Sequence, residues 1–194
     1  MSTLIKELKI GLVVTGLIGV IVCGFYPLLV FVAAQALFPD QANGSLIYHD
    51  ARVVGSRLLG QPFAGPGYFH PRPSAAGAGY DAAASNGSNL GPTSQTLIDN
   101  VAERVKVHRE ENGLGPDASM PADAVTASAS GLDPHISVEN AALQVDRVAA
   151  ARKMSIETVQ ELVQKYTESR DLGVFGEPRV NVLELNLALD GIQE

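Results

Sequence analysis

The stretch TASASGLDPHIS, from Thr126 to Ser137, contains residue types from which a hydrolase site could be built. Ser130 carries a hydroxyl, Asp133 a carboxylate and His135 an imidazole, the groups of a nucleophile, its orienting acid and its base. Triad members normally come from distant positions, however, and the Gly-x-Ser-x-Gly turn that often exposes such a serine is missing. We therefore expect a structural stretch that ends a strand, turns at the Asp-Pro pair and caps a helix with Ser137.

Metal and nucleotide chemistry have even weaker support. The four histidines are far apart in sequence, and the single cysteine, Cys23, has no cysteine partner, so no zinc-site spacing occurs. The chain also lacks the Gly-Lys-Ser/Thr of a phosphate-binding loop. We expect no metal site, no stably bound cofactor and no catalytic site. The polar loops at Arg72, Asn86 to Asn89 and Asp133 to His135 suit contact with a larger partner.

An apolar helix precedes these loops in the sequence. No charged residue occurs from Ile10 to Pro39, whereas about 20 apolar residues suffice to cross a hydrocarbon core of about 30 Å. We therefore assign residues 1–9 to the cytoplasm, 10–38 to a transmembrane helix and 39–194 to an extracytoplasmic domain. The fold class that we predict is α+β, with this one transmembrane helix followed by a mixed α/β domain.

The orientation of the span follows from its flanking charges. Lys6 and Lys9 precede it and Asp40 follows it, which favours a cytoplasmic amino terminus. A cleaved signal peptide is the alternative, because Ala34-Gln35-Ala36 matches a cleavage pattern. The apolar run is, however, longer than the roughly 7–15 residues of a signal. We therefore expect a retained, single-pass anchor.

Small residues within the span indicate contact with another helix. They recur every four positions and so lie on one stripe, which allows close helix approach. The four residues of this stripe are Gly11, Thr15, Gly19 and Cys23. Pro27 lacks a backbone donor and is expected to kink the helix near Tyr26.

The outer region shows mixed secondary-structure signals. A hairpin or two short strands are expected at Leu46 to Tyr48 and Val53 to Val54, and an irregular stretch from Gly65 to Pro92. Three amphipathic helices follow, beginning at Thr93 or Ser94, at Ser137 and at Ser155. The leucines from Leu183 to Leu189 alternate with other residues, which favours a strand, although Asn181 could cap a helix there.

Net charge excludes one class of partner. The formal net charge is -7, and the basic residues of the outer region are scattered rather than clustered. A nucleic-acid-binding surface needs a basic patch. We therefore expect partners to be proteins and lipid, not nucleic acid.

Taken together, strings distributed along the whole chain resemble one family. They look like the C subunit of potassium-transporting P-type ATPases, the KdpC family. In chain order the strings are FYPLL, QANGSLI, GSRLLGQPF, GYFHPRPSA, SNGSNLGPT, VTASASGLDPHIS, AALQVDRVAAAR and VNVLELNLALD. Pro71 and Asn86 stand where the family pattern has glycines, so loop detail near Arg72 is expected to differ.

The resemblance implies an accessory subunit of a bacterial inner-membrane potassium uptake complex. Its partners would be a potassium-conducting subunit, an ATP-hydrolysing subunit and a small accessory subunit. It further implies a catalytic chaperone that raises the ATP affinity of the hydrolysing subunit, with ATP reached only through the complex. Residues that would take part are Ser85, Gly87, Ser88 and Asn89 of a signature-like segment, together with Gln144, whose alternative is a solvated helix flank.

A domain outside the membrane cannot touch cytoplasmic ATP, so this implication conflicts with the topology. A docking or lid role over the potassium entrance fits the sequence better, and any effect on ATP affinity must then cross the membrane as a coupling free energy. We expect the subunit contacts to include Arg72, Ser130, Asp133 and His135, besides the stripe in the span. Two alternatives remain, an anchored hydrolase using Ser130 and His135, and a tethered binding module unrelated to a pump.

Overall fold

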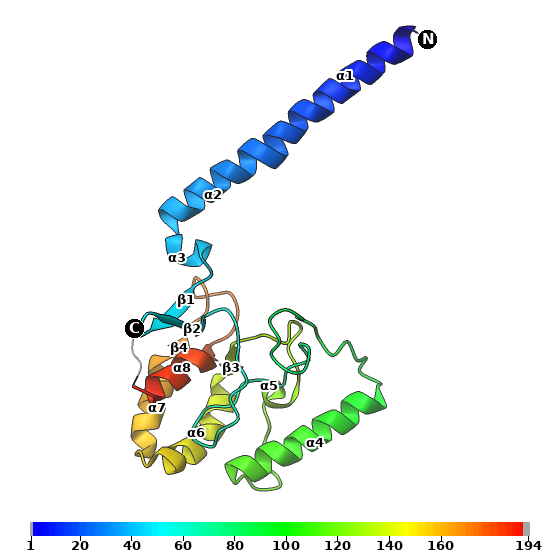
Figure 1. The fold of residues 1–194 in the computed structure, drawn as a ribbon. Helices are drawn as coiled ribbons and strands as arrows, with labels where there is room; N and C mark the ends of the chain where they lie inside the picture. The colour runs from blue at the N-terminus through cyan, green and yellow to red at the C-terminus, as the bar shows by residue number, and fades with distance from the viewer. Residues whose placement is uncertain (1, 192–194) are drawn as a thin grey trace. The chain divides into compact units, whose positions relative to one another are not determined.

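The computed structural model describes residues 2–191 (Figure 1). Contacts between Cα atoms divide the chain into residues 1–46 and residues 47–194, two units that are described separately below. The boundary falls a few residues after the predicted end of the transmembrane helix at residue 38.

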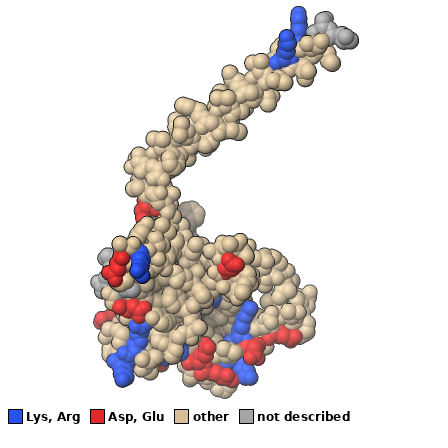
Figure 2. Space-filling view, in the orientation of Figure 1, with Lys and Arg blue, Asp and Glu red and all other residues tan. Residues whose placement is uncertain are grey.

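The first unit is helical. It comprises α1 (Ser2–Gly19), the π-helical segment η1 (Val20–Phe25), α2 (Tyr26–Leu37) and the short α3 (Pro39–Ala42). Thr3–Leu37 forms one helix long and apolar enough to cross a membrane. In Figure 2 the helix is tan along most of its length, with basic side chains near its amino-terminal end. The predicted apolar helix is confirmed, while its place in a membrane stays a prediction.

The region before Pro27 departs from α-helical geometry. The π-helical segment Val20–Phe25 ends just before the turn that contains Pro27. Because Pro27 cannot donate to the carbonyl four residues earlier, the hydrogen-bonding pattern of the preceding turn is free to widen. The irregularity therefore occurs where the sequence predicted a kink. The stripe of small residues crosses from α1 into η1, and its contact with another helix stays a prediction.

The second unit combines two small sheets with five helices among the described residues. β1 (Leu46–His49) and β2 (Arg52–Ser56) form the predicted hairpin, and β3 (His135–Ser137), β5 (Arg179–Asn181) and β4 (Thr167–Glu168) form an antiparallel sheet in that order. The helices are α4 (Gln95–Asn112), α5 (Ala122–Val125), α6 (Val138–Arg152), α7 (Ile156–Lys165) and α8 (Val182–Leu189). The α+β prediction is confirmed.

One hydrophobic core joins α6, α7, α8 and the three-stranded sheet. Val148 of α6, Val159 of α7 and Leu185 of α8 are each fully buried in it, together with Val180 of β5. Phe69 is also fully buried there, although it belongs to no helix or strand. The irregular chain is therefore anchored to the core through Phe69.

Local cap signals predicted two of the helices well. The Ser137 hydroxyl accepts a hydrogen bond from the Asn140 N–H and the Ser155 hydroxyl one from the Thr158 N–H, as N-caps do. α4 begins after Ser94 as expected, but the Ser94 side chain makes no capping bond.

Two strand predictions are wrong. Thr126 does not end a strand as expected but follows the short helix α5, and the strand of this stretch, β3, begins directly after Asp133-Pro134. The alternating leucines form α8, because the Asn181 side chain accepts from the N–H groups of Leu183 and Glu184 and so caps a helix. Asn186 is fully buried in α8, and its polar side chain on the inner face produced the misleading alternation.

Candidate functional site

An irregular segment from Gly65 to Pro73, which begins with a turn closed by the Tyr68 N–H and the Gly65 carbonyl, belongs to no strand. No helix or strand is assigned between Ser56 and Gln95, a stretch that is described throughout. Buried backbone polar groups must nonetheless be paired. Side chains of α6 and α8 do this pairing, and the surrounding surface loops are the candidate functional site.

Two side-chain amides each bind the backbone of one residue in this segment twice. The Phe69 N–H donates to Asn186 Oδ1 at 2.8 Å, and Asn186 Nδ2 donates to the Phe69 carbonyl at 2.9 Å. The next residue repeats the pattern, since the His70 N–H donates to Gln144 Oε1 at 2.7 Å and Gln144 Nε2 donates to the His70 carbonyl at 3.1 Å. Each amide thereby replaces the edge of a neighbouring strand.

Two arginines of α6 bind the three preceding carbonyls. Arg147 Nη1 donates to the Pro66 carbonyl at 2.7 Å and to the Tyr68 carbonyl at 2.9 Å. Arg152 Nε donates to the Gly67 carbonyl at 2.6 Å. All five carbonyls from residue 66 to residue 70 thus accept a hydrogen bond from a side chain of α6 or α8. We call these four side chains, Gln144, Arg147, Arg152 and Asn186, the side-chain clamp.

Gln144 does not lie on a solvated flank of its helix. Its side chain is fully buried, so the interpretation as a solvated helix flank is wrong. Besides binding His70, Nε2 donates to Asn140 Oδ1 at 3.0 Å, and Oε1 accepts from Arg147 Nη2 at 2.7 Å. The amide is thus engaged on both ends by groups of the chain itself.

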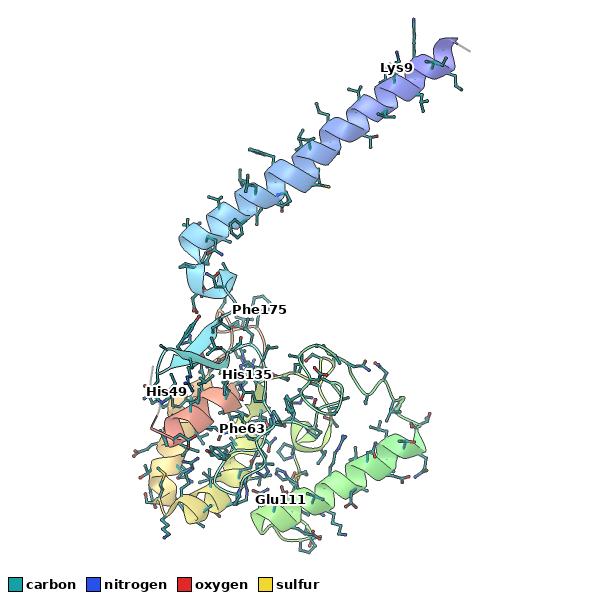
Figure 3. All side chains as sticks on the ribbon, viewed as in Figure 1. Lys9, His49, Phe63, Glu111, His135 and Phe175 are labelled. Carbon is teal, nitrogen blue, oxygen red and sulfur yellow. The ribbon has the colours of Figure 1, made fainter. Side chains whose placement is uncertain are left out.

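Helix α4 closes the clamp from another side. Arg147 Nε donates to Asn112 Oδ1 at 2.9 Å, and His70 Nδ1 lies 3.3 Å from a Glu111 carboxylate oxygen. His108 is buried beside them, and this burial lowers the pKa of its imidazole. Figure 3 shows Glu111 near the end of α4 that approaches α6.

Arg72 continues from the clamped segment into the polar loops. Its Nη1 donates to Asp133 Oδ2 at 2.8 Å, and its carbonyl accepts from the Tyr80 hydroxyl at 2.6 Å. The Ser74 hydroxyl donates to the Gly131 carbonyl at 2.6 Å. Gly131 has φ +68°, and a Cβ there would lie 2.6 Å from the Ala76 nitrogen. This contact therefore requires glycine.

The signature-like segment packs against the same turn. The Ser130 carbonyl accepts from the Ser85 hydroxyl at 2.9 Å and from the Asn86 N–H at 3.0 Å. A Cβ on Gly87 would lie 2.9 Å from the Ala129 carbonyl oxygen, whereas Ser88 and Asn89 are exposed. The structure thus brings Arg72, Ser85 to Asn89 and Ser128 to Asp133 together, and we call this surface the loop platform. Gln144 is not part of it, because its side chain is buried against His70, Asn140 and Arg147.

The platform does not form a hydrolase triad. The Ser130 hydroxyl accepts from the Leu132 N–H at 3.1 Å. His135 places its ring nitrogens 3.5 Å from Asp133 Oδ1 and 3.6 Å from Glu168 Oε1. Within residues 2–191 no hydrogen bond joins Ser130 to His135, so the base does not reach the proposed nucleophile.

Electrostatics stabilise the charged form of Asp133. Burial acts to raise the pKa of this carboxyl, but hydrogen bonds from His135 and Arg72 outweigh burial, and the pKa lies below its ordinary value. Sequence reasoning named Arg72, Asp133 and His135 but could not pair them. Tyr80 was missed, although burial raises the pKa of its hydroxyl far above its usual value and keeps it a neutral donor.

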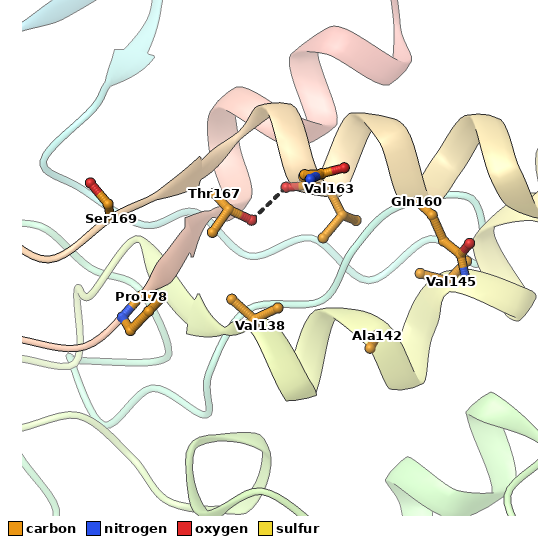
Figure 4. A pocket seen from close by; sticks show the side chains of 9 residues that line it. Val138, Ala142, Val145, Gln160, Val163, Thr167, Ser169 and Pro178 are labelled. Carbon is orange, nitrogen blue, oxygen red and sulfur yellow. Dashed lines mark hydrogen bonds between the residues drawn. The ribbon is translucent and has the colours of Figure 1, made fainter.

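A separate cavity of about 490 Å³ lies between α6, α7 and the sheet (Figure 4). Val138, Val145 and Val163 contribute apolar walls, and the Thr167 hydroxyl already donates to the Val163 carbonyl at 2.7 Å. No charged residue and no predicted site residue lines it. The cavity is therefore unsuited to a nucleotide, which carries several negative charges.

Comparison with known proteins gives one consistent family. The model of the family described as K+-transporting ATPase, c chain (KdpC) matches residues 8–191. A protein of Nitratidesulfovibrio vulgaris, named potassium-transporting ATPase KdpC subunit, is 57% identical over 99% of this chain and 96% of its own length. Proteins of the same name from Mycobacterium tuberculosis and Koribacter versatilis are 54% and 51% identical, over 96% and 99% of this chain and 97% and 96% of their own lengths.

Replacing Gln144 tests the clamp. Gln144→Ala leaves the His70 N–H and carbonyl buried without their partner, so we expect the free energy of unfolding to fall by about 2–3 kcal/mol. Denaturant titration of the full chain in detergent would measure this change. Gln160→Ala on α7 is the matched control, because Gln160 is exposed; it should change stability by less than about 0.5 kcal/mol. Equal effects of the two substitutions on the free energy of unfolding would contradict the stabilising role of the clamp.

The low pKa of Asp133 predicts a pH-dependent contribution to stability. A carboxyl whose pKa is depressed in the folded chain stabilises fully above the unfolded value, near 3.9, and loses this contribution as pH falls through the folded value. Thermal unfolding should therefore show Asp133→Asn to be less stable than the parent at pH 7, with the difference shrinking below about pH 4. Asp117→Asn, on an exposed loop, is the control. A pH-independent difference would refute the assignment.

Proposed function

The chain belongs to the KdpC family of K+-transporting ATPase c chains, and from this premise we propose that it is the accessory subunit of an ATP-driven potassium uptake pump. The observation that carries the proposal is the relationship itself, which extends over nearly the whole chain and nearly the whole of each relative. The arrangement of the residues agrees with an accessory role, because the loop platform offers polar groups for contact and no assembled triad.

The proposal places the chain in a bacterial inner membrane. The helix Thr3–Leu37 would cross once, with Lys6 and Lys9 on the cytoplasmic side and residues 47–194 outside. A helix of this length extends about 50 Å, which exceeds the hydrocarbon core and allows tilt or a turn beyond the lipid. The stripe of small residues, Gly11, Thr15, Gly19 and Cys23, would pack against a helix of another subunit.

The loop platform is the surface that we propose docks on the pump. It is rigidly supported, because Arg72 continues directly from the clamped segment and pairs with Asp133. Ser88 and Asn89 remain exposed for contact. With the domain outside the membrane, the partner face would belong to the potassium-conducting subunit near its entrance, while the ATP-hydrolysing and small subunits complete the complex.

The second part of the proposal concerns the ATP affinity of the hydrolysing subunit. With the platform outside the membrane, the chain would act as a catalytic chaperone by favouring the conformation of the pump that binds ATP well. Such coupling is reciprocal and typically changes affinity by about 5-fold to 150-fold. Direct nucleotide contact by Ser85 to Asn89 or Gln144 is the competing route. The full burial of Gln144 and the engagement of its amide favour coupling over contact.

Omitting the chain tests the proposed function. Potassium-stimulated ATP hydrolysis by the remaining purified subunits should show an apparent KM for ATP raised by about 5-fold or more, or no assembly. Adding the chain back should restore the parent value. In complexes that assemble with Ser130→Ala, the rate of ATP hydrolysis should be kept, because the Ser130 hydroxyl accepts from the Leu132 N–H and is not a nucleophile. An unchanged KM and intact assembly without the chain would contradict the proposal. Loss of activity with Ser130→Ala, despite assembly, would revive the hydrolase alternative.

A further inference from the structure

The loop between β4 and β5 exposes three large apolar side chains. Leu172, Val174 and Phe175 are 90%, 71% and 65% exposed. They occupy consecutive or nearly consecutive positions, and we call them the apolar tip. Isolated exposed apolar residues are ordinary, but a cluster on one protruding turn indicates a surface that becomes covered.

The backbone conformation of this turn is unfavourable for one of its apolar residues. Asp171 and Phe175 pair across the turn through two hydrogen bonds of 2.8 and 2.9 Å. Leu172 between them has φ +53°, in the left-handed region that favours Gly, Asn and Asp. A leucine here is conformationally unfavourable and gains no burial in return. We therefore interpret the exposed Leu172 side chain as one that contacts something outside the described chain.

The charged residues beside the tip are paired with one another. Arg170 binds Glu177, and Arg179 binds Glu168 at 2.8 Å and Asp171 at 3.4 Å. Pairing lowers the cost of bringing these groups toward an apolar medium. The turn thus presents apolar side chains at its end and neutralised ion pairs at its base.

The location of the tip within the second unit indicates what covers it. Figure 3 shows Phe175 at the same end of the 47–194 unit as β1, through which the chain enters that unit. Only residues 38–46 separate the apolar helix from the second unit, a stretch that spans at most about 32 Å when fully extended. If the helix spans a membrane, this end of the domain is tethered close to the lipid surface.

We propose that the apolar tip inserts into the headgroup and upper acyl region of the membrane that holds the helix, and so acts as a second anchor that orients the domain. The proposal rests on the membrane anchoring proposed above. Aromatic and aliphatic side chains insert in this way to a depth of about 5–10 Å. Lipid fits the tip better than a protein partner does, because three side chains on a turn need no complementary groove in a fluid interface.

The absence of tryptophan from the sequence allows a direct test. Phe175→Trp places a single fluorophore on the tip, and Ile98→Trp places one on α4, where Ile98 is 52% exposed. Each full-length variant is incorporated into phosphatidylcholine vesicles and first shown to float with them. Vesicles with bromine on the upper acyl carbons should quench the tip fluorophore roughly twofold, because it lies near that depth. They should leave the α4 fluorophore unquenched.

A second substitution separates insertion from folding. Leu172→Asn suits the left-handed turn, so it preserves the fold while removing apolar surface. Added to Phe175→Trp, it should reduce quenching. Equal quenching of the tip and α4 fluorophores, or no quenching of the tip fluorophore in vesicles with which the protein floats, would overturn the proposal. In the assembled pump, the tip fluorophore could show blue-shifted emission, which reports an apolar environment, without quenching by brominated lipid. This result would mean that the tip contacts another subunit and not lipid. Failure to float would refute the membrane anchoring itself.

Discussion

The second unit depends on satisfying five successive backbone carbonyls that have no strand beside them. Within residues 66–70, Phe69 is fully buried and Gly67, Tyr68 and His70 are partly buried. An unpaired buried carbonyl or N–H costs as much as a lost hydrogen bond. Asn186 and Gln144 bind both backbone groups of Phe69 and of His70, and the two arginines of α6 bind the rest. Pro66 begins the segment and Pro71 and Pro73 follow it, and these three residues have no N–H to satisfy. The composition of the segment and the side chains that hold it therefore complement each other.

This arrangement connects the core to the surface that we propose for docking. Phe69 is fixed in the core by burial and by Asn186, and three residues later Arg72 reaches Asp133. Asp133 lies three residues after Ser130, whose carbonyl accepts from Ser85 and Asn86 of the signature-like segment. A substitution of Gln144 would therefore affect the loop platform through the backbone, without any contact between Gln144 and a ligand.

Local signals predicted the elements that depend on neighbouring residues, and missed those that depend on distant ones. Ser137 and Ser155 cap helices within a few residues of themselves, and the hairpin of β1 and β2 follows from its own pattern. The inner face of α8 contains Asn186, whose partner Phe69 lies 117 residues away, so the leucine pattern alone indicated a strand. Gln144 was likewise misjudged because its partner His70 is 74 residues away. The site residues Arg72 and Asp133 were named from their types, but their pairing required the fold.

Amide hydrogen exchange of Phe69 and His70, in the full chain in detergent, tests the central claim most directly. If side-chain amides replace a strand partner, both N–H groups should exchange as slowly as those of β3 and β5, where Ile136 pairs with Val180. Exchange as fast as that of the exposed loop residues Gly115 and Asp117 would contradict the account. It would mean that the segment is not held in the core, and that the link from Gln144 to the loop platform does not exist.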